Sequence, residues 1–174
     1  KKDILSFDIS ESQKCFLVII KKNLNTHEIN NLGATLKSNL KLDKNIKNIC
    51  MFAENISNEV VTEFAYGFEL KSYSFDKYKS KKDNFFQTID LTVKNLNSLR
   101  LKYKDLSSIK DGVFLARDLV SEPPNVLNPK KYTEEIKKLS SLGLDVEILN
   151  EKELKKLGMN SLLGVGQGSQ NESF

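Results

Sequence analysis

The sequence has little of what metal centres, disulfide scaffolds and membrane spans require. Its 174 residues include one histidine, two cysteines, three prolines and no tryptophan. No apolar run approaches the roughly 20 residues that cross a bilayer, and residues 1–3 do not begin a signal peptide. A cytoplasmic protein without a membrane partner is therefore expected. Cys15 and Cys50 each lie in a predicted strand, which favours buried, reduced thiols over a disulfide.

The charge balance is only mildly basic. The net charge is +4 at pH 7, 39% of the residues are hydrophobic and 29% are charged. This composition is typical of a globular chain, and it falls short of the lysine and arginine bias of a dedicated nucleic-acid binder. A chain of this length buries about 70% of its unfolded surface, so it can form a core without disulfides.

Apolar periodicity predicts strands that alternate with helices. Helix starts are marked by Thr26, by Ser57, by Ser108 with Asp111, by Asn128 before Pro129, and by Asn150 with Glu153. Gly143 and Gly158 are placed to end helices. Strands are expected at residues 15–20, 46–52, 86–93, 146–149 and 161–165, and helices at 25–40, 58–72, 108–121, 129–142 and 151–157. This alternation indicates an α/β fold with a mixed, largely parallel sheet.

Residues 111–129 organise the chain. An amphipathic helix ends at Glu122, where Pro123 and Pro124 follow. A residue before proline is pushed out of the helical region, and each proline fixes its own backbone angle, so residues 122–125 are expected to be extended. Such a stiff strut suits a junction between two folded bodies.

The chain shows no catalytic constellation. It has no Cys-x-x-Cys, His-x-x-x-His or Asp-x-Asp grouping and no G-x-S-x-G. His27 lies at a predicted helix start, where a solvent-facing role is favoured over a ligand role. We therefore predict no catalytic, cofactor-binding or metal-binding residue.

Two local patterns each have two interpretations. Residues 164–169 (GVGQGS) follow a predicted strand, so they form either a phosphate-cradling loop or, as favoured, a flexible strand-exit turn; Ser169 stands where the dinucleotide fingerprint has Gly or Ala. The other pattern is FDKYKSKK. It contains Lys77, Lys79, Lys81 and Lys82 with Tyr78 between them, so it is either a phosphate-backbone contact or, as favoured, a solvated loop.

Two longer stretches resemble the leucyl aminopeptidase (cytosol aminopeptidase) family. Members show A-R-x-L, then N/E-x-P-N and T-P, and later a G-M-G-x-x-L-x-V-x-x-G-S turn. Asn128 and Asn160 replace the usual Thr and Gly, which are mild departures. The matching residues of these motifs are Ala116, Arg117, Leu119, Glu122, Pro124, Asn125, Pro129, Gly158, Met159, Leu162, Val165, Gly168 and Ser169. An earlier stretch matches at Gly67, Tyr73, Phe75, Asp76, Tyr78 and Lys79.

The resemblance implies a two-domain hydrolase subunit, with a macro-domain-like α/β domain that has helices on both faces of its sheet. The implied activity is metalloprotease chemistry: two divalent metal ions, manganese or zinc, support removal of amino-terminal residues from peptides, within a homo-hexamer. The residues that perform it lie in the motifs V-G-K-G-x-x-F-D-S/T-G-G and N-T-D-A-E-G-R, neither of which occurs in this sequence. No cofactor of its own is expected, and the chain alone is predicted to be inactive.

On this basis residues 1–106 are expected to form an amino-terminal accessory domain. Residues 107–128 would form a linker helix and proline strut, and residues 129–174 the beginning of a truncated catalytic peptidase domain, through which peptide substrates would bind. The alternative is a macro-like nucleotide-binding or DNA-binding module. It is disfavoured because no Gly-rich phosphate loop precedes Gly112 and only the Lys77 to Lys82 loop is dense in positive charge.

Overall fold

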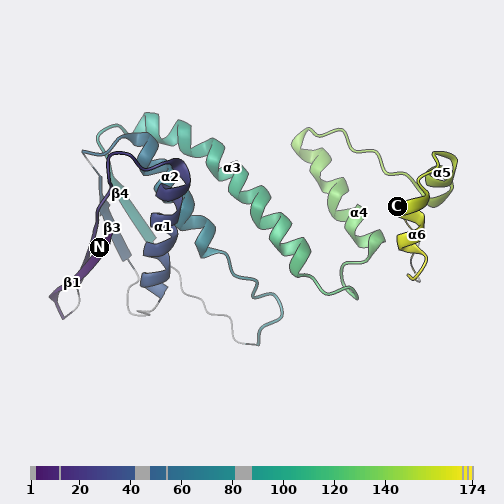
Figure 1. Ribbon diagram of the computed structural model, residues 1–174, viewed down its shortest axis with the longest axis horizontal. Coiled ribbons are helices and arrows are strands. Elements are labelled where there is room, and N and C mark those ends of the chain that lie inside the picture. The colour runs from purple at the N-terminus through teal and green to yellow at the C-terminus, as the bar shows by residue number, and fades with distance from the viewer. Residues whose placement is uncertain are drawn as a thin grey trace. The chain divides into compact units, whose positions relative to one another are not determined.

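The computed structural model describes residues 3–11, 13–41, 48–53, 55–80, 88–169, 171 and 173. The chain divides into two compact units, Lys1–Leu115 and Ala116–Phe174 (Figure 1). Helix α3 (Leu96–Ser121) continues from the first unit into the second. Within the described ranges, no helix has the length and apolar character needed to cross a membrane.

The first unit combines two small sheets with helices. Strand β1 (Ile4–Ser10) pairs antiparallel with β2 (Gln13–Val18), so that Ile4 lies opposite Val18. After helix α1 (Thr26–Lys41), strand β3 (Asn48–Phe52) pairs in parallel with β4 (Thr88–Thr92), and helix α2 (Asn58–Ser72) connects them. The predicted α/β class, with mixed strand directions, is confirmed, and the described strands are divided between two two-stranded sheets.

The core of this unit lies where α1 and α2 cross. Ile29, Leu36, Leu40, Phe64 and Phe68 form one buried cluster. Side chains from the hairpin and from β3 pack against it, namely Ile4, Phe16, Val18, Ile49 and Met51. The two helices therefore cover one face of each small sheet with a shared apolar layer.

Strand β1 was not predicted from the sequence. Its apolar residues Leu5, Phe7 and Ile9 remain 45%, 54% and 64% exposed and alternate with the polar Ser6, Asp8 and Ser10, whereas Ile4 packs on the core. The alternation is that of a strand. Because its mixture of exposed apolar and polar residues is not a buried run, the pairing with β2 is what defines it.

Helix α3 begins at Leu96, well before the predicted start at Ser108. Asn95 is its cap, since its side-chain oxygen accepts from the Ser98 amide at 3.2 Å. The predicted capping box of Ser108 and Asp111 is wrong, because Ser108 lies inside the helix and its hydroxyl donates to the Lys104 carbonyl at 3.1 Å. Leu96, Leu99, Tyr103 and Leu106 follow helical spacing among polar residues, so this part of the helix does carry an apolar signal that was overlooked, although only Leu99 of α3 is buried.

Capping at the other two helices of this unit follows local rules. Ser57 caps α2 as predicted, accepting from the Val60 amide at 3.4 Å. For α1 the cap is Asn25 and not Thr26, because Asn25 and Glu28 exchange side-chain-to-backbone hydrogen bonds of 3.0 and 2.8 Å. This reciprocal pair satisfies two amides at the helix start.

The connector after α3 is a turn and not the predicted extended strut. The carbonyl oxygen of Pro123 accepts from the amides of Val126 and Leu127, both at 2.9 Å. Pro124 thus follows the first residue of a tight turn, the position where its fixed backbone angle is favoured. Proline forces an extended conformation only on the residue directly before it. The chain then closes into a turn.

The second unit is helical in its described residues. It contains α4 (Pro129–Lys137), the 3₁₀ helix η1 (Lys138–Leu142), α5 (Glu151–Lys156) and α6 (Asn160–Gly166). The predicted cap of α4 is confirmed, since Asn128 accepts from Lys131 at 3.0 Å. The capping box of Asn150 and Glu153 is also confirmed. Gly143 and Gly158 follow helix ends with φ of 88° and 70°.

Two strand predictions in this unit are wrong. Residues 146–149 have no regular structure, and residues 161–165 lie inside helix α6. The Leu163 amide donates to the Met159 carbonyl at 3.2 Å, a helical bond. No strand is assigned among the described residues of this unit, and a strand without a neighbour leaves its backbone groups unpaired. A helix satisfies them within the segment.

Candidate functional site

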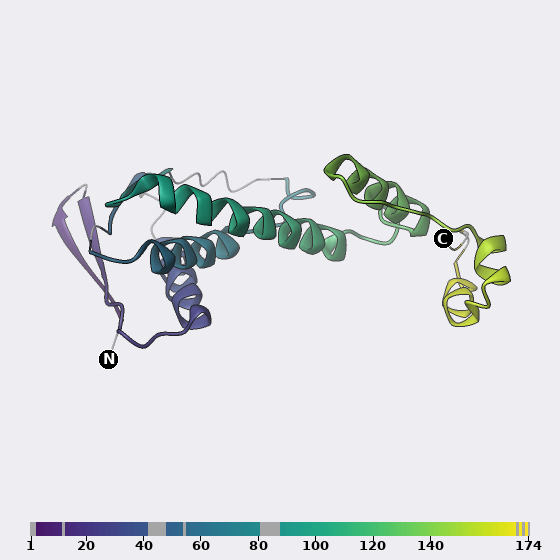
Figure 2. The ribbon, with the colours of Figure 1, turned by 90° about the horizontal axis from the view of Figure 1, so that it is seen from above.

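Helices α2 and α3 are joined by a line of side-chain contacts that we call the α2–α3 seam. The Asn58 side chain donates to the Asn95 carbonyl at 2.9 Å, and Lys102 lies 3.8 Å from Glu59. Further along, Lys110 lies 3.0 Å from Glu69, and the rings of Tyr73 and Phe114 are 5.2 Å apart. The contacts occur in the same order along both helices, which therefore run in the same direction (Figure 2).

Glu69 is the centre of this seam. Its carboxylate pairs with the ammonium of Lys110, which is also 3.4 Å from Asp111 and lies 6.0 Å from the centre of the Phe114 ring. Burial raises the pKa of Tyr103 well above its usual value, and a hydrogen bond to Glu69 raises it further. Burial lowers the pKa of Lys110, but the hydrogen bonds and charges of Glu69 and Asp111 outweigh this effect and raise it overall.

The electrostatics of this seam hold α3 on the first unit. Neutral Tyr103 and charged Lys110 are the forms that the Glu69 carboxylate favours. The Glu69 carboxylate interacts with both Lys110 and Tyr103, so this arrangement acts as a clamp between two helices. Sequence inspection missed it because the partners lie far apart in the chain, and only the tertiary structure brings them together.

A cavity of about 1250 Å³ lies between β2 and β3, and we call it the strand slot. The residues that line it are consecutive along both strands, 13–18 on β2 and 49–52 on β3, with Ala53 directly after β3. A sheet face would present alternate residues, so the cavity follows the strand edges. Its floor consists of buried side chains of α1 and α2, namely Leu36, Leu40, Val61 and Phe64.

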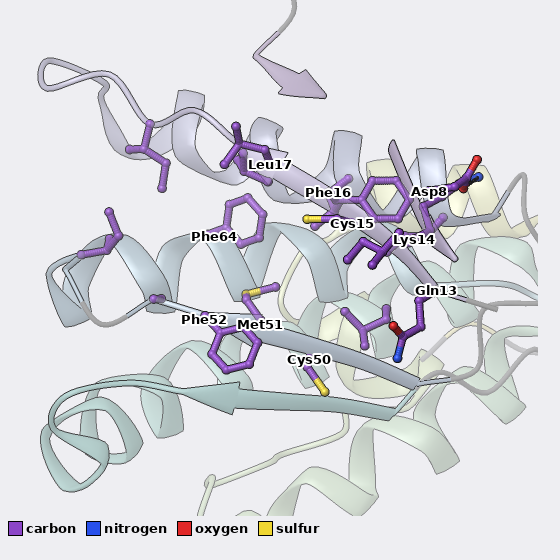
Figure 3. Close-up of a pocket in the computed structure, with 18 of the residues that line it drawn as sticks. Asp8, Gln13, Lys14, Cys15, Phe16, Leu17, Cys50, Met51, Phe52 and Phe64 are labelled. Atoms are coloured by element: carbon purple, nitrogen blue, oxygen red, sulfur yellow. Dashed lines mark ion pairs between the residues drawn. The ribbon is translucent and has the colours of Figure 1, made fainter. Parts of the chain in front are cut away.

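Side chains of both strands surround this slot in Figure 3. Cys15 and Phe16 come from β2, Cys50 and Met51 from β3, and Phe64 from α2. Both cysteines are free thiols, as predicted. The expectation that both are buried is wrong, because Cys15 is half-buried and Cys50 is exposed. Among the residues that the structure describes, β3 pairs only with β4, and no strand is paired with its other edge.

The other candidate residues lie apart from the slot and the seam. His27 is exposed near the start of α1, as predicted. Residues 164–166 are the last residues of α6, so the expected strand-exit turn is a helix end. In the lysine loop, Lys79 pairs with Asp76, and the Lys77 ammonium lies 5.7 Å from the centre of the Tyr78 ring. Lys81 and Lys82 are outside the described residues.

A metal centre needs at least three converging ligands. Across the residues that the structure describes, no group of three or more His, Cys, Asp or Glu side chains is placed to hold an ion. The described residues therefore do not fit a dinuclear metal site, and no chemical step of this chain is assigned to a metal.

The sequence of this chain is similar to those of aminopeptidases. Residues 114–174 match the family described as "Cytosol aminopeptidase family, catalytic domain". A probable cytosol aminopeptidase of Agrobacterium fabrum is 38% identical over 181 residues, covering 96% of this chain and 35% of that protein. One of Rhizobium leguminosarum is 39% identical over 154 residues, covering 84% of this chain and 31% of that protein. The chain thus spans about a third of the length of these relatives.

Solved structures show the same fold. A mutant of tomato leucine aminopeptidase superposes with a TM-score of 0.78 at 23% identity, over 97% of this chain and 36% of that one. The bottromycin maturation enzyme BotP in complex with Mn gives a TM-score of 0.71 at 18% identity, over 97% of this chain and 37% of that one. At these sequence identities, the similarity to the two solved structures shows a shared fold only.

Proposed function

Because this chain belongs to the cytosol aminopeptidase family, we propose that it is the amino-terminal, non-catalytic part of a leucyl aminopeptidase. The whole enzyme would be a dinuclear metal-dependent hydrolase that removes amino-terminal residues from peptides. One observation carries the proposal. The chain aligns over 96% of its length with a relative of which it covers 35%, and its similarity to the catalytic domain begins only at residue 114.

The proposed division of labour has three parts. Residues 1–106 form the accessory domain, residues 107–128 the linker helix and proline turn, and residues 129–174 the beginning of the catalytic domain. The division into units at Leu115 and Ala116 supports a boundary within α3. In this scheme the α2–α3 seam gives the linker helix a defined seat on the accessory domain.

The seam supports this role because its contacts are distributed along both helices. A single ion pair at the surface contributes at most about 1 kcal/mol, and it leaves a helix free to rotate about that contact. Contacts near both ends of α2, at Asn58 and Tyr73, determine the direction of α3 as well as its position. The accessory domain would thereby present the start of the linker in one orientation.

The metals of the whole enzyme are proposed to bind outside this chain. Two divalent ions, manganese or zinc, would polarise the scissile carbonyl and supply a hydroxide at neutral pH. BotP, which shares this fold, forms a complex with Mn, and this supports manganese as one candidate. Peptide substrates would bind through the catalytic domain. The names of the relatives support a cytoplasmic location, and a homo-hexamer is proposed for the whole enzyme.

The proposal predicts that the 174-residue chain alone is inactive. Leucine p-nitroanilide is incubated with the purified chain and Mn²⁺ or Zn²⁺, beside a metal-only blank and a tomato leucine aminopeptidase control. We expect release of p-nitroaniline from the control alone. Turnover by the chain above the blank would contradict the proposal, since the chain would then hold a catalytic site of its own.

Assembly is tested separately. Size-exclusion chromatography with light scattering compares the chain with a version extended to the length of its relatives. We expect the extended version to form the hexamer and the 174-residue chain to remain smaller. A hexamer of the short chain would show that the accessory unit is the main assembly surface, against the proposal.

A further inference from the structure

The strand slot has the geometry of a site for an added β-strand. Among the described residues, β2 pairs only with β1 and β3 pairs only with β4. The second edges of β2 and β3 line one cavity, whose floor is apolar. An unpaired strand edge offers a row of backbone donors and acceptors to another extended chain. Here two such edges border the same space.

Backbone directions on β2 follow from the ladder. The Ile19 amide donates to the Asp3 carbonyl at 2.9 Å, on the β1 side. In an antiparallel ladder, successive residues direct their N–H and C=O groups to opposite sides. Cys15 and Leu17 therefore direct their backbone N–H and C=O groups towards β1. Phe16 and Val18 direct theirs away from β1, towards the edge that lines the slot.

The same reasoning applies to β3. The Ala53 amide donates to the Thr92 carbonyl at 3.0 Å, on the β4 side. Because backbone directions alternate along the strand, Ile49 and Met51 direct their N–H and C=O groups towards β4. Cys50 and Phe52 direct theirs to the other edge. Both edges thus offer two residues whose amides and carbonyls can pair with a guest strand.

The floor and the rim restrict the guest further. Buried Leu36, Leu40, Val61 and Phe64 lie below the slot and favour apolar side chains at every second position of the guest. Of the three charged residues that line it, Asp8 and Glu11 are acidic and Lys14 is basic. All three lie near the hairpin turn. Lys14 pairs with Asp8 at 3.7 Å and Glu11 adds a further negative charge, so the local charge is net negative and favours a basic residue at that end of the guest.

We propose that the strand slot binds an extended peptide with alternating apolar side chains and a basic residue at one end, which joins β2 and β3 through backbone hydrogen bonds. The site lies within the first unit. It does not depend on the proposed function, because it requires neither a catalytic domain nor a metal.

The test uses the whole 174-residue chain and a fluorescein-labelled peptide of about seven residues, the length of an ordinary strand. In this peptide valine and threonine alternate after an initial lysine. One control peptide has the same composition with the valines consecutive, and another has proline at its centre, which removes a backbone donor. We expect saturable binding by fluorescence polarisation, with each control at least about tenfold weaker. Equal affinity for all three peptides would overturn the proposal.

Protein variants separate the slot from the other free edge. Phe52→Pro removes an amide directed to the slot, and Phe52→Ala is its side-chain control, since the Phe52 side chain is 77% exposed. Ser6→Pro removes a donor from the outer edge of β1, which is not among the slot residues. We expect Phe52→Pro to weaken binding about tenfold relative to Phe52→Ala, and Ser6→Pro to leave it within about twofold. A loss confined to Ser6→Pro would overturn the proposal.

Hydrogen exchange on the unmodified chain keeps the test valid if a proline variant fails to fold. The amides of Phe16, Val18, Cys50 and Phe52 should exchange rapidly in the free chain and become protected when the alternating peptide binds. Protection of these amides without peptide would show that the two edges pair with each other, which would also overturn the proposal.

Discussion

Gly67 of α2 lies so close to Asn30 of α1 that a side chain cannot be added to it. A Cβ atom built on Gly67 would lie 2.0 Å from the carbonyl oxygen of Asn30. The partner position is equally tight, because a Cβ on Gly33 would lie 2.0 Å from the carbonyl oxygen of Phe64. The two glycines therefore let the backbones of α1 and α2 approach at the centre of the core.

Replacing Gly67 with alanine should destabilise the first unit by at least about 2 kcal/mol. The clash is with backbone, so a helix has to shift, and this cost exceeds the roughly 1 kcal/mol that alanine gains in a helix. The measurement is the free energy of unfolding in urea. Gly112→Ala in α3 is the control, because nothing lies within 4 Å of its added Cβ. It should stabilise by up to about 1 kcal/mol. A neutral Gly67→Ala would contradict the close crossing.

The α2–α3 seam should weaken at alkaline pH. The pKa of Tyr103 is raised in the folded chain, so above about pH 10 the unfolded chain releases this proton while the folded chain keeps it. The stabilisation is fully present below the unfolded pKa and is lost as the pH rises towards the folded value. The raised pKa of Lys110 acts in the same direction.

Tyr103→Phe should reduce this pH dependence. It removes the hydrogen bond to Glu69, at a cost of about 1 kcal/mol near neutral pH, and it leaves a shallower decline above pH 10. Urea unfolding at a series of pH values measures both effects. Tyr132→Phe, at an exposed tyrosine of α4, should retain the decline of the unmodified chain. Parallel declines in all three proteins would show that Tyr103 is not responsible.

The capping box of α5 should determine whether that short helix forms. Asn150 accepts from the amides of Lys152 and Glu153 at 3.0 and 3.2 Å, and the Glu153 carboxylate accepts from the Asn150 amide at 2.7 Å. Asn150→Ala should cost about 1 kcal/mol and speed amide exchange in α5 several-fold. Asn150→Asp retains the accepting oxygen and is the matched control. Equal exchange in the two variants would argue against the cap.

Pro124→Gly should loosen the turn after α3. Proline restricts the unfolded chain and fits the turn, so its replacement should cost roughly 1 kcal/mol locally. The Val126 and Leu127 amides, which donate to Pro123, should then exchange faster. Pro129→Gly, at the first residue of α4, is the control and should leave these two amides unchanged. Unchanged exchange in Pro124→Gly would show that the turn does not depend on this proline.

Prediction from sequence succeeded where a capping side chain and the backbone amide that it binds lie within a few residues of each other. The caps at Ser57, Asn128 and Asn150 were found because each side chain accepts from an amide two or three residues ahead. It failed at the start of α3, where Leu96, Leu99, Tyr103 and Leu106 follow helical spacing but the intervening polar residues were taken for a connecting passage. It also failed at residues 161–165, where a short apolar run fits a strand and a helix equally well.

The strand slot and the α2–α3 seam could not be predicted because each brings together segments that are distant in sequence. Glu69 and Lys110 meet across helices that are separated in sequence by residues 73–95, which include β4. The edges of β2 and β3 that have no paired strand among the described residues are defined by which strands pair, and pairing depends on partners that the local sequence does not specify. Cys50 was expected to be buried, and it is exposed along one of these edges.

The sequence by itself determined the family, through motifs at residues 116–129 and 158–169, and the helix ends that a nearby side chain or glycine can close. These depend on local hydrogen bonds and on backbone restrictions within one or two turns. The tertiary structure decided that Gly33 and Gly67 serve a close helix crossing, that α3 is seated on α2, and that two strand edges border one cavity. Those features depend on contacts between distant segments, whose free energy is gained only when the core packs.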